Sequence, residues 1–340
     1  MGAYGLQTHI WNNNWKTVLL MAGFPILLIL LLYALFLLFA GFSGVSVGPD
    51  PVAGPFIWAA DALAQAWPFA VAGAILWFGI AYAFYQNIID AATGAKKVTR
   101  VEEPKLYNLL ENLCISRGIT MPALRIMETD ALNAFATGLH KGQYSVTVTR
   151  GLMAHLNDAE IEAVLAHELT HIRNSDVRLL VIAVVFVGIF SFVGELAFRS
   201  LRFGGASSGR STSSRSSSSG GRSDGGGAII AILAALAIIA IAYALAIVIR
   251  FALSRRREYL ADAGAVELTK NPDAMISALQ KISGNAAVNA PSEVREMFIE
   301  NPHSDFASLF ATHPPIEKRI EALAKFAGGR VAQQTAGPWG

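Results

Sequence analysis

The chain has 340 residues, of which 53% are hydrophobic and only 15% are charged, and this composition is too apolar for an ordinary soluble enzyme. A formal net charge of +2 gives no strongly basic face, so we expect no nucleic-acid partner. The single cysteine, Cys114, excludes an intramolecular disulfide and a thiolate zinc finger.

Four segments are apolar and long enough to cross about 30 Å of hydrocarbon as helices. The first is too long for the core of a cleavable signal peptide, so we expect a permanent anchor. Two segments lie in an N-terminal region, residues 1–98, and the other two form a hairpin within 177–253. The predicted spans are 17–42, 68–87, 177–198 and 228–253.

The basic residues predict the orientation of these spans. Four crossings place 1–16, 88–176 and 254–340 on one side of the membrane, and 43–67 and 199–227 on the other. The 43–67 loop has no Lys or Arg, and the five arginines of 199–227 are outnumbered on the first side. By the positive-inside rule we therefore expect the large segments to be cytoplasmic. The basic residues near membrane ends on that side are Lys96, Lys97, Arg100, Arg173, Arg178, Arg255, Arg256 and Arg257.

Two segments lack the composition of a packed structure. Residues 199–227 are rich in Gly, Ser and Arg and bury too little apolar surface to offset their ordering entropy, so we expect a flexible loop between the third and fourth spans. Residues 327–340 have the composition of a disordered tail.

We expect one soluble α+β domain in two parts, residues 99–176 and 254–326. A helix over 102–117 leads to strands near 123–128 and 144–149, the latter showing the alternation of a half-buried strand. Asn157, with Glu160 three residues later, resembles a capping box that opens the helix EIEAVLAHELTHIRN. Further helices are expected at 272–283 and 314–326.

The sequence His167-Glu168-Leu169-Thr170-His171 predicts a metal site on that helix. Residues four apart share one helix face, so both histidines reach one ion, while Glu168 lies about 100° around the axis. Zinc with three protein ligands keeps a position for water, and the adjacent carboxylate is placed to act as its base. A helix with two surface histidines is the alternative, but the apolar residues 163–166 favour a buried helix and therefore a metal.

A third ligand is expected from the segment SRRREYLADAGA, which follows the fourth span. Glu258 and Asp262 share a helix face there, and we assign Glu258 to zinc and Asp262 to a hydrogen bond with a ligand histidine. A solvated acidic pair is the alternative. The competing third ligands are Asp262, Asp176 and His313.

HELTH, the later EYLAD and the segments NAFATG (133–138) and THPPIEKRI (312–320) together resemble the HtpX-type membrane metalloproteases, relatives of the CAAX prenyl proteases. The resemblance covers about 88–326, and only the long loop at 203–227 departs from it. It implies a mostly α fold in a bacterial inner membrane, with four transmembrane helices and a cytoplasmic α+β zincin-like metalloprotease domain with a small sheet. It also implies one zinc ion per chain, with His167, His171 and Glu258 as ligands and Glu168 as catalytic base.

The same resemblance implies roles around the metal. Asn133, Ala134 and Phe135 would lie at the rim of the substrate cleft, where an extended segment pairs with peptide backbone, although the local sequence fits a turn equally well. His313 and Arg319 would stabilise the tetrahedral oxyanion, or each is a plain helix-end residue. The implied substrates are damaged or misfolded membrane proteins and unfolded polypeptides, cleaved at the cytoplasmic face in protein quality control.

Three other functions fit the sequence less well. A CAAX-type protease acting on lipidated C-termini would need more spans than four. A catalytically silent scaffold has no need of Glu168. A metal transporter would place charges inside its spans, which contain almost none, and Glu195 lies near the end of the third. The sequence gives no indication of the oligomeric state.

Overall fold

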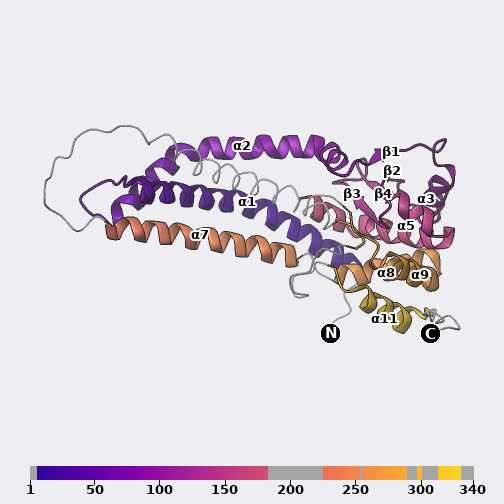
Figure 1. Cartoon of the computed structure of the whole chain (residues 1–340). Coiled ribbons are helices and arrows are strands. Elements are labelled where there is room, and N and C mark those ends of the chain that lie inside the picture. Colours follow the sequence, from indigo (N-terminus) through magenta and orange to yellow (C-terminus); the bar gives the residue numbers. More distant parts are fainter. Residues whose placement is uncertain (1–5, 183–224, 253–255, 289–296, 301–312, 331–340) are drawn as a thin grey trace. The chain divides into compact units, whose positions relative to one another are not determined.

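The computed structural model describes residues 6–182, 225–252, 256–288, 297–300 and 313–330 (Figure 1). The chain divides into two units, one of residues 1–17, 84–184 and 250–340, and an apolar one of residues 18–83 and 185–249. In chain order the elements are α1 Leu6–Ser43, α2 Ala53–Thr93, β1 Lys96–Lys97, α3 Pro104–Arg117, β2 Ala123–Met127, β3 Ala134–Thr137, β4 Ser145–Thr149, α4 Arg150–His155, α5 Asp158–Arg173, α7 Gly225–Ala252, α8 Arg256–Thr269, α9 Pro272–Ile282 and α11 Ile316–Ala327. The predicted mostly α fold with a small sheet is confirmed.

Long apolar helices make up the described part of the apolar unit. Within the residues that the structure describes, two stretches are long and apolar enough to cross a membrane, Pro25–Ser43 and Ala53–Thr93. They include most of the first predicted span and all of the second. Gly226–Ala242 is an apolar stretch of α7 that overlaps the fourth predicted span. Most of the third span lies outside the described residues, as do residues 199–224 and 331–340.

The helix of the second span is longer than the sequence predicted. We expected a loop over 43–67, but residues 53–67 are helical and continue into α2 without interruption. Alanine-rich sequence and a proline that the helix accommodates at Pro68 explain the extension. A helix of 41 residues is about 60 Å long, twice the hydrocarbon thickness, so part of α2 extends beyond the membrane.

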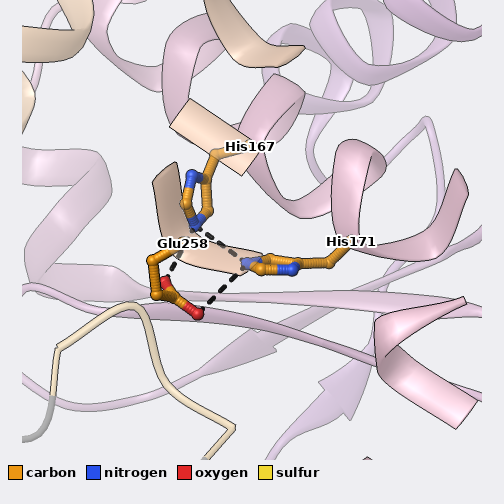
Figure 2. Close-up of side chains that lie close together, drawn as sticks. All are labelled: His167, His171 and Glu258. Atoms are coloured by element: carbon orange, nitrogen blue, oxygen red, sulfur yellow. Dashed lines mark hydrogen bonds and ion pairs between the residues drawn. The ribbon is translucent and has the colours of Figure 1, made fainter. Parts of the chain in front are cut away.

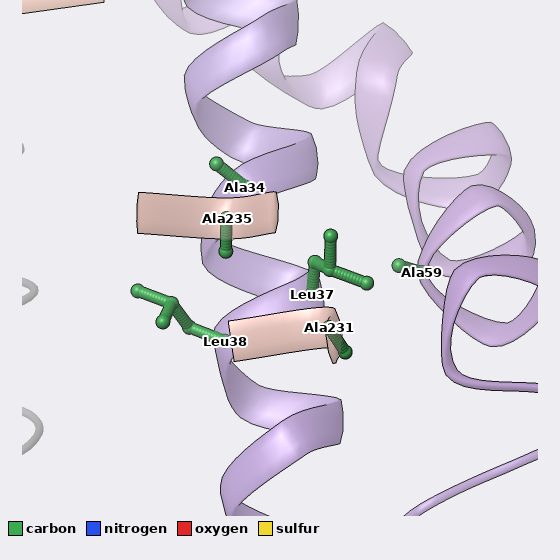
Figure 3. Close-up of a cluster of buried hydrophobic side chains, with 6 residues drawn as sticks. All are labelled: Ala34, Leu37, Leu38, Ala59, Ala231 and Ala235. Carbon is green, nitrogen blue, oxygen red and sulfur yellow. The ribbon is translucent and has the colours of Figure 1, made fainter. Parts of the chain in front are cut away.

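Small side chains let α1, α2 and α7 approach one another. Their buried cluster consists mainly of alanine (Figure 3). An added Cβ at Gly41 of α1 would lie 3.1 Å from the carbonyl oxygen of Ala228 on α7, so the helix crossing requires glycine there. Such small-residue contacts are typical of helix packing in membranes. The cluster is formed by Ala34, Leu37, Leu38, Ala59, Ala231 and Ala235.

A four-stranded mixed sheet lies in the other unit, in the order β1-β2-β4-β3. β2 and β4 are parallel, and β1 and β3 pair antiparallel with β2 and β4, respectively. β2 and β4 confirm the two predicted strands, and their apolar residues, among them Leu124 and Val146, are buried. The NAFATG segment forms a strand, β3, rather than a turn, and β3 lies at the sheet edge.

Helix α5 is the buried centre of this unit. The predicted capping box opens it: Asn157 Oδ1 accepts the Glu160 N–H at 3.0 Å, and Glu160 Oε2 accepts the Asn157 N–H at 2.8 Å. Glu160 also accepts bonds from Ser277 and Lys281 of α9, which ties the start of α5 to that helix. Residues 163–172 are all buried, which confirms the helix environment expected from the sequence.

Candidate metal centre

Two helices bring three metal-binding side chains together (Figure 2). α5 carries His167 and His171 one turn apart, with their Nε2 atoms 3.1 Å from each other. Glu258, in the first turn of α8, places Oε2 3.7 Å from Nε2 of His167 and Oε1 3.7 Å from Nε2 of His171. One ligand atom from each residue therefore fits within 4.8 Å of the others, which suits a single ion.

Carboxylates hold the far side of each imidazole. Nδ1 of His167 lies 3.0 Å from Oδ1 of Asp262, and Nδ1 of His171 lies 2.9 Å from Oδ2 of Asp176. Such outer carboxylates fix the proton on Nδ1, so that Nε2 carries the lone pair that binds metal. Of the competing third ligands, Asp262 and Asp176 thus face the Nδ1 atoms, on the side away from the converging Nε2 atoms.

The charges around the centre favour a cation. Burial alone would raise the pKa of Glu258, but the imidazoles of His313 and His171 and the contact with His167 hold that pKa well below its usual range. Burial alone would lower the pKa of His171, but Glu258 and Asp176 raise it to about 10. The same carboxylates that favour a positive charge here would favour a bound metal ion.

Glu168 lies beside the ligands and is only 2% exposed. Its pKa is raised by burial, which outweighs the favourable effect of the two histidines. A carboxyl group with a raised pKa is a better proton acceptor near neutral pH than an exposed one. Glu168 and the three ligands line a common cavity of only about 10 Å³, so the centre is closed in this conformation.

Arg319 and His313 approach this centre from the C-terminal part of the domain. Arg319 is fully buried, and its Nε and Nη2 bond to Asp262 at 2.9 and 2.6 Å. Its Nη1 bonds to the carbonyl oxygen of Ile299 at 3.0 Å, so all three nitrogens contact protein groups. His313 Nδ1 lies 3.3 Å from Glu258 Oε2, close to the position where the ion would sit.

The segment of residues 297–300 covers the outer edge of β3. The Ile299 N–H lies 3.0 Å from the Ala134 carbonyl oxygen and 3.1 Å from Asn133 Oδ1. Asn133 Nδ2 donates to the carbonyl oxygens of Ala286 and Glu300, and the Phe135 and Phe298 rings pack with centroids 5.0 Å apart. In this conformation the side chain of Asn133 is engaged by the protein itself.

Arg257 is a residue whose position sequence reasoning missed. From the sequence, Arg257 was counted only among the basic residues that follow the fourth predicted span. In the structure its side chain is 3% exposed and lines the metal cavity. Its Nε lies 3.3 Å from Glu258 Oε1, and its guanidinium has no hydrogen-bond partner among the described residues. Its position immediately before Glu258 could have predicted this, because residues adjacent to a metal ligand on one helix lie near the metal site.

Comparisons with known proteins identify the family of this chain. The model of peptidase family M48 matches residues 101–327. A protease HtpX homolog from Bacteroides fragilis is 46% identical over 268 residues, which cover 76% of this chain and 80% of the relative. Another from Listeria monocytogenes is 46% identical over 245 residues, 70% of this chain and 79% of the relative. The crystal structure of S. mikatae Ste24p is 18% identical, covers 92% of this chain and 66% of its own, and has a TM-score of 0.42.

A helix with HExxH spacing and a carboxylate from a second helix define a metallopeptidase, and two of the described stretches are long and apolar enough to cross a membrane. The chain belongs to peptidase family M48, in which it is similar to the HtpX-type proteases. The family resemblance seen in the sequence is confirmed, and membership implies a bound metal ion.

Proposed function

We propose that this protein is a zinc-dependent endopeptidase that cleaves damaged or misfolded membrane proteins at the cytoplasmic face of a bacterial inner membrane. The observation that carries the proposal is the convergence of His167, His171 and Glu258 beside a buried Glu168. The proposed catalytic domain has two parts, residues 99–176 and 254–326, and the family match extends over both.

The donor set fits one zinc ion per chain, with His167 Nε2, His171 Nε2 and a Glu258 oxygen as ligands. A zinc ion bound there supplies Lewis acidity and lowers the pKa of a coordinated water to about 7. Asp262 and Asp176 orient the two imidazoles through Nδ1. Arg319, which is bonded to Asp262, is better explained as a residue that positions this carboxylate than as a substrate contact.

Glu168 carries the proton in this mechanism. Its carboxylate accepts a proton from the attacking water and returns it to the leaving amine. His313 and Arg257 each lie 3.3 Å from a Glu258 oxygen, and both are proposed to stabilise the oxyanion. The closed cavity implies that these contacts form fully only after substrate enters.

Substrate is proposed to bind as an extra strand along β3, next to Ala134 and Phe135. An edge strand offers backbone donors and acceptors to an extended peptide. In this structure residues 297–300 already occupy that edge through the Ile299 N–H bond to the Ala134 carbonyl oxygen, so substrate must displace them. This requirement favours unfolded polypeptides, because a folded helix or sheet has no backbone groups left to pair.

Replacing Glu168 by Gln tests the proposal. We expect Glu168→Gln to retain zinc and to lose casein cleavage by a factor of about 100 or more, because only the base is removed. Zinc content and cleavage would be measured on detergent-purified protein, with Glu162→Gln on the same helix as the matched control. Undiminished cleavage by zinc-loaded Glu168→Gln protein would refute the assignment.

A further inference from the structure

A second cavity, of about 360 Å³, lies at the C-terminal end of α5 and shares no lining residue with the metal cavity. Its ten lining residues include Lys141, Arg173, Arg178 and His140 and no Asp or Glu. The volume falls in the range of about 300–1,000 Å³ that small ligands occupy. Hydroxyl groups of three further lining residues add donors, namely Thr120, Tyr144 and Ser175. This lining suits an anion.

The contacts of Arg178 and Arg173 within the described part of the chain leave most of their positive charge uncompensated. Arg178 donates from Nε to the Leu139 carbonyl oxygen at 3.1 Å and from Nη1 to Asn14 Oδ1 at 3.2 Å, and both acceptors are neutral. Arg173 Nη1 lies 4.0 Å from Oε2 of Glu267, whose side chain is 52% exposed, so solvent weakens that pair. The carbonyl end of α5 contributes about −0.5 elementary charge, which three side-chain cations outweigh.

The contacts of the cavity place it at the membrane ends of three predicted spans. Asn14, which Arg178 contacts, lies just before the span 17–42. Arg178 itself lies at the start of the span 177–198. The Tyr85 hydroxyl, near the end of the span 68–87, donates to the Gln143 carbonyl oxygen at 2.9 Å, next to the lining residue Tyr144. Tyrosine and arginine at span ends are typical of the membrane–water interface, so the predicted spans would put the cavity beside the headgroup layer.

We propose that this cavity binds a phosphate group and that the headgroup of an anionic phospholipid supplies it. Guanidinium, ammonium and hydroxyl donors match the oxygens of a phosphate, and basic pockets beside membrane helices bind anionic headgroups. A lipid bound there ties the end of α5, two residues after His171, to the bilayer surface. The inference concerns a site that the proposed peptidase mechanism does not use.

The test compares lipid binding by matched charge variants of the full chain. Lys141→Gln/Arg173→Gln removes two charges from the cavity, and Lys96→Gln/Lys97→Gln removes two exposed charges from β1, which follows α2. Each protein is reconstituted in phosphatidylcholine with or without phosphatidylglycerol, extracted gently, and examined by native mass spectrometry. We expect wild type and the β1 variant to retain phosphatidylglycerol, and the cavity variant to bind it about tenfold more weakly.

A titration with inorganic phosphate distinguishes free phosphate from a lipid headgroup as the source of the bound phosphate group. Phosphate is titrated at constant ionic strength into delipidated protein, with the melting temperature as readout. Phosphate that stabilises wild type while no phosphatidylglycerol is retained would overturn the lipid assignment. Retention by the cavity variant, or equal loss by the β1 variant, would overturn the site. If Arg173→Gln lowers the zinc content or the stability, the double variant His140→Gln/Lys141→Gln is used as the cavity variant, because both residues are exposed lining residues. Its lipid binding is judged by the same outcomes.

Discussion

At the scale of single residues, each imidazole of the candidate metal centre turns Nε2 toward Glu258 and Nδ1 toward an aspartate. Asp262 has a second function, because it is also the partner of the buried Arg319 guanidinium. Burial alone would raise the pKa of Asp262, but Arg319 and His167 lower it. Replacing Glu258 and replacing Asp262 should therefore have different effects on zinc affinity and on stability.

We predict that Glu258→Ala weakens zinc binding by more than about 100-fold, and that Asp262→Ala weakens it by only about 10–100-fold, because a supporting carboxylate orients a ligand without being one. Asp262→Ala should in addition destabilise the zinc-free protein by about 3–5 kcal/mol, since it removes the carboxylate that accepts two hydrogen bonds from the buried Arg319 guanidinium. Competition with a chromophoric zinc chelator and thermal unfolding measure the two effects.

The double variant Asp262→Leu/Arg319→Met is the control for this prediction. Replacing both charges by apolar groups should restore stability but not zinc affinity. A double variant as unstable as Asp262→Ala would contradict the role of the ion pair, and stronger zinc loss in Asp262→Ala than in Glu258→Ala would make Asp262 the third ligand.

At the scale of elements, the crossing of α5 and α8 sets the distance between the histidines and Glu258. Gly264 of α8 lies against Thr170 of α5, and a Cβ added at Gly264 would lie 2.7 Å from Thr170 Oγ1, with the Thr170 methyl group closer still. Glycine is therefore required for this close approach, although it lowers helix propensity.

We predict that Gly264→Ala destabilises the protein by about 1–3 kcal/mol and weakens zinc binding, because α8 must move away from α5. Adding Thr170→Ala removes two of the three closest atoms and should recover part of both losses. Gly79→Ala is the matched control, since an added Cβ there meets nothing within 4 Å. Thermal or denaturant unfolding measures the loss of stability, and zinc titration measures the loss of affinity. Unchanged zinc affinity in Gly264→Ala would show that the α5–α8 crossing does not determine the geometry of the metal centre.

The edge of β3 gives a second prediction at this scale. If substrate pairs with β3, the Ile299 N–H must lose its acceptor at Ala134. We predict that an unfolded peptide bound to zinc-loaded Glu168→Gln protein increases hydrogen exchange at Ile299 several-fold, while the β2–β4 ladder stays protected. Exchange measured by mass spectrometry on peptide fragments covers both regions. Unchanged protection at Ile299 with peptide bound would place the substrate elsewhere.

At the scale of the whole molecule, the orientation in the membrane stays a prediction from charge. The chain offers a direct test, because its one cysteine, Cys114, is buried and is replaced by Ala to give a thiol-free background. Ser46 is exposed in the segment between α1 and α2, and Val101 is 91% exposed before α3.

In intact cells, we predict that a membrane-impermeant maleimide labels Ser46→Cys but labels Val101→Cys only after the membrane is broken. The reason is that Val101 follows Lys96, Lys97 and Arg100, whereas the segment around Ser46 has no basic residue. Gel-shift or mass measurement of the labelled chain gives the result. The opposite labelling pattern would place the metal centre outside the cytoplasm.

Local features of this protein were determined by its sequence. The four-residue spacing of His167 and His171 places both on one helix face wherever the helix packs, and the Asn157 capping box starts that helix through bonds within one turn. The strand alternation of β4 and the apolar character of α1 and α2 are also properties of short windows of sequence. These were predicted because neighbouring residues decide them.

Only the tertiary structure decided which carboxylate faces both Nε2 atoms. Glu258 and Asp262 are one turn apart and equivalent by pattern, but the contact of Gly264 with Thr170 and the bonds from Arg319 direct Glu258 to the centre and Asp262 to Nδ1 of His167. The cover of β3 by residues 297–300 and the basic cavity at the end of α5 likewise combine segments far apart in the chain. No short window of sequence contains such contacts, because they depend on how helices and strands pack against one another.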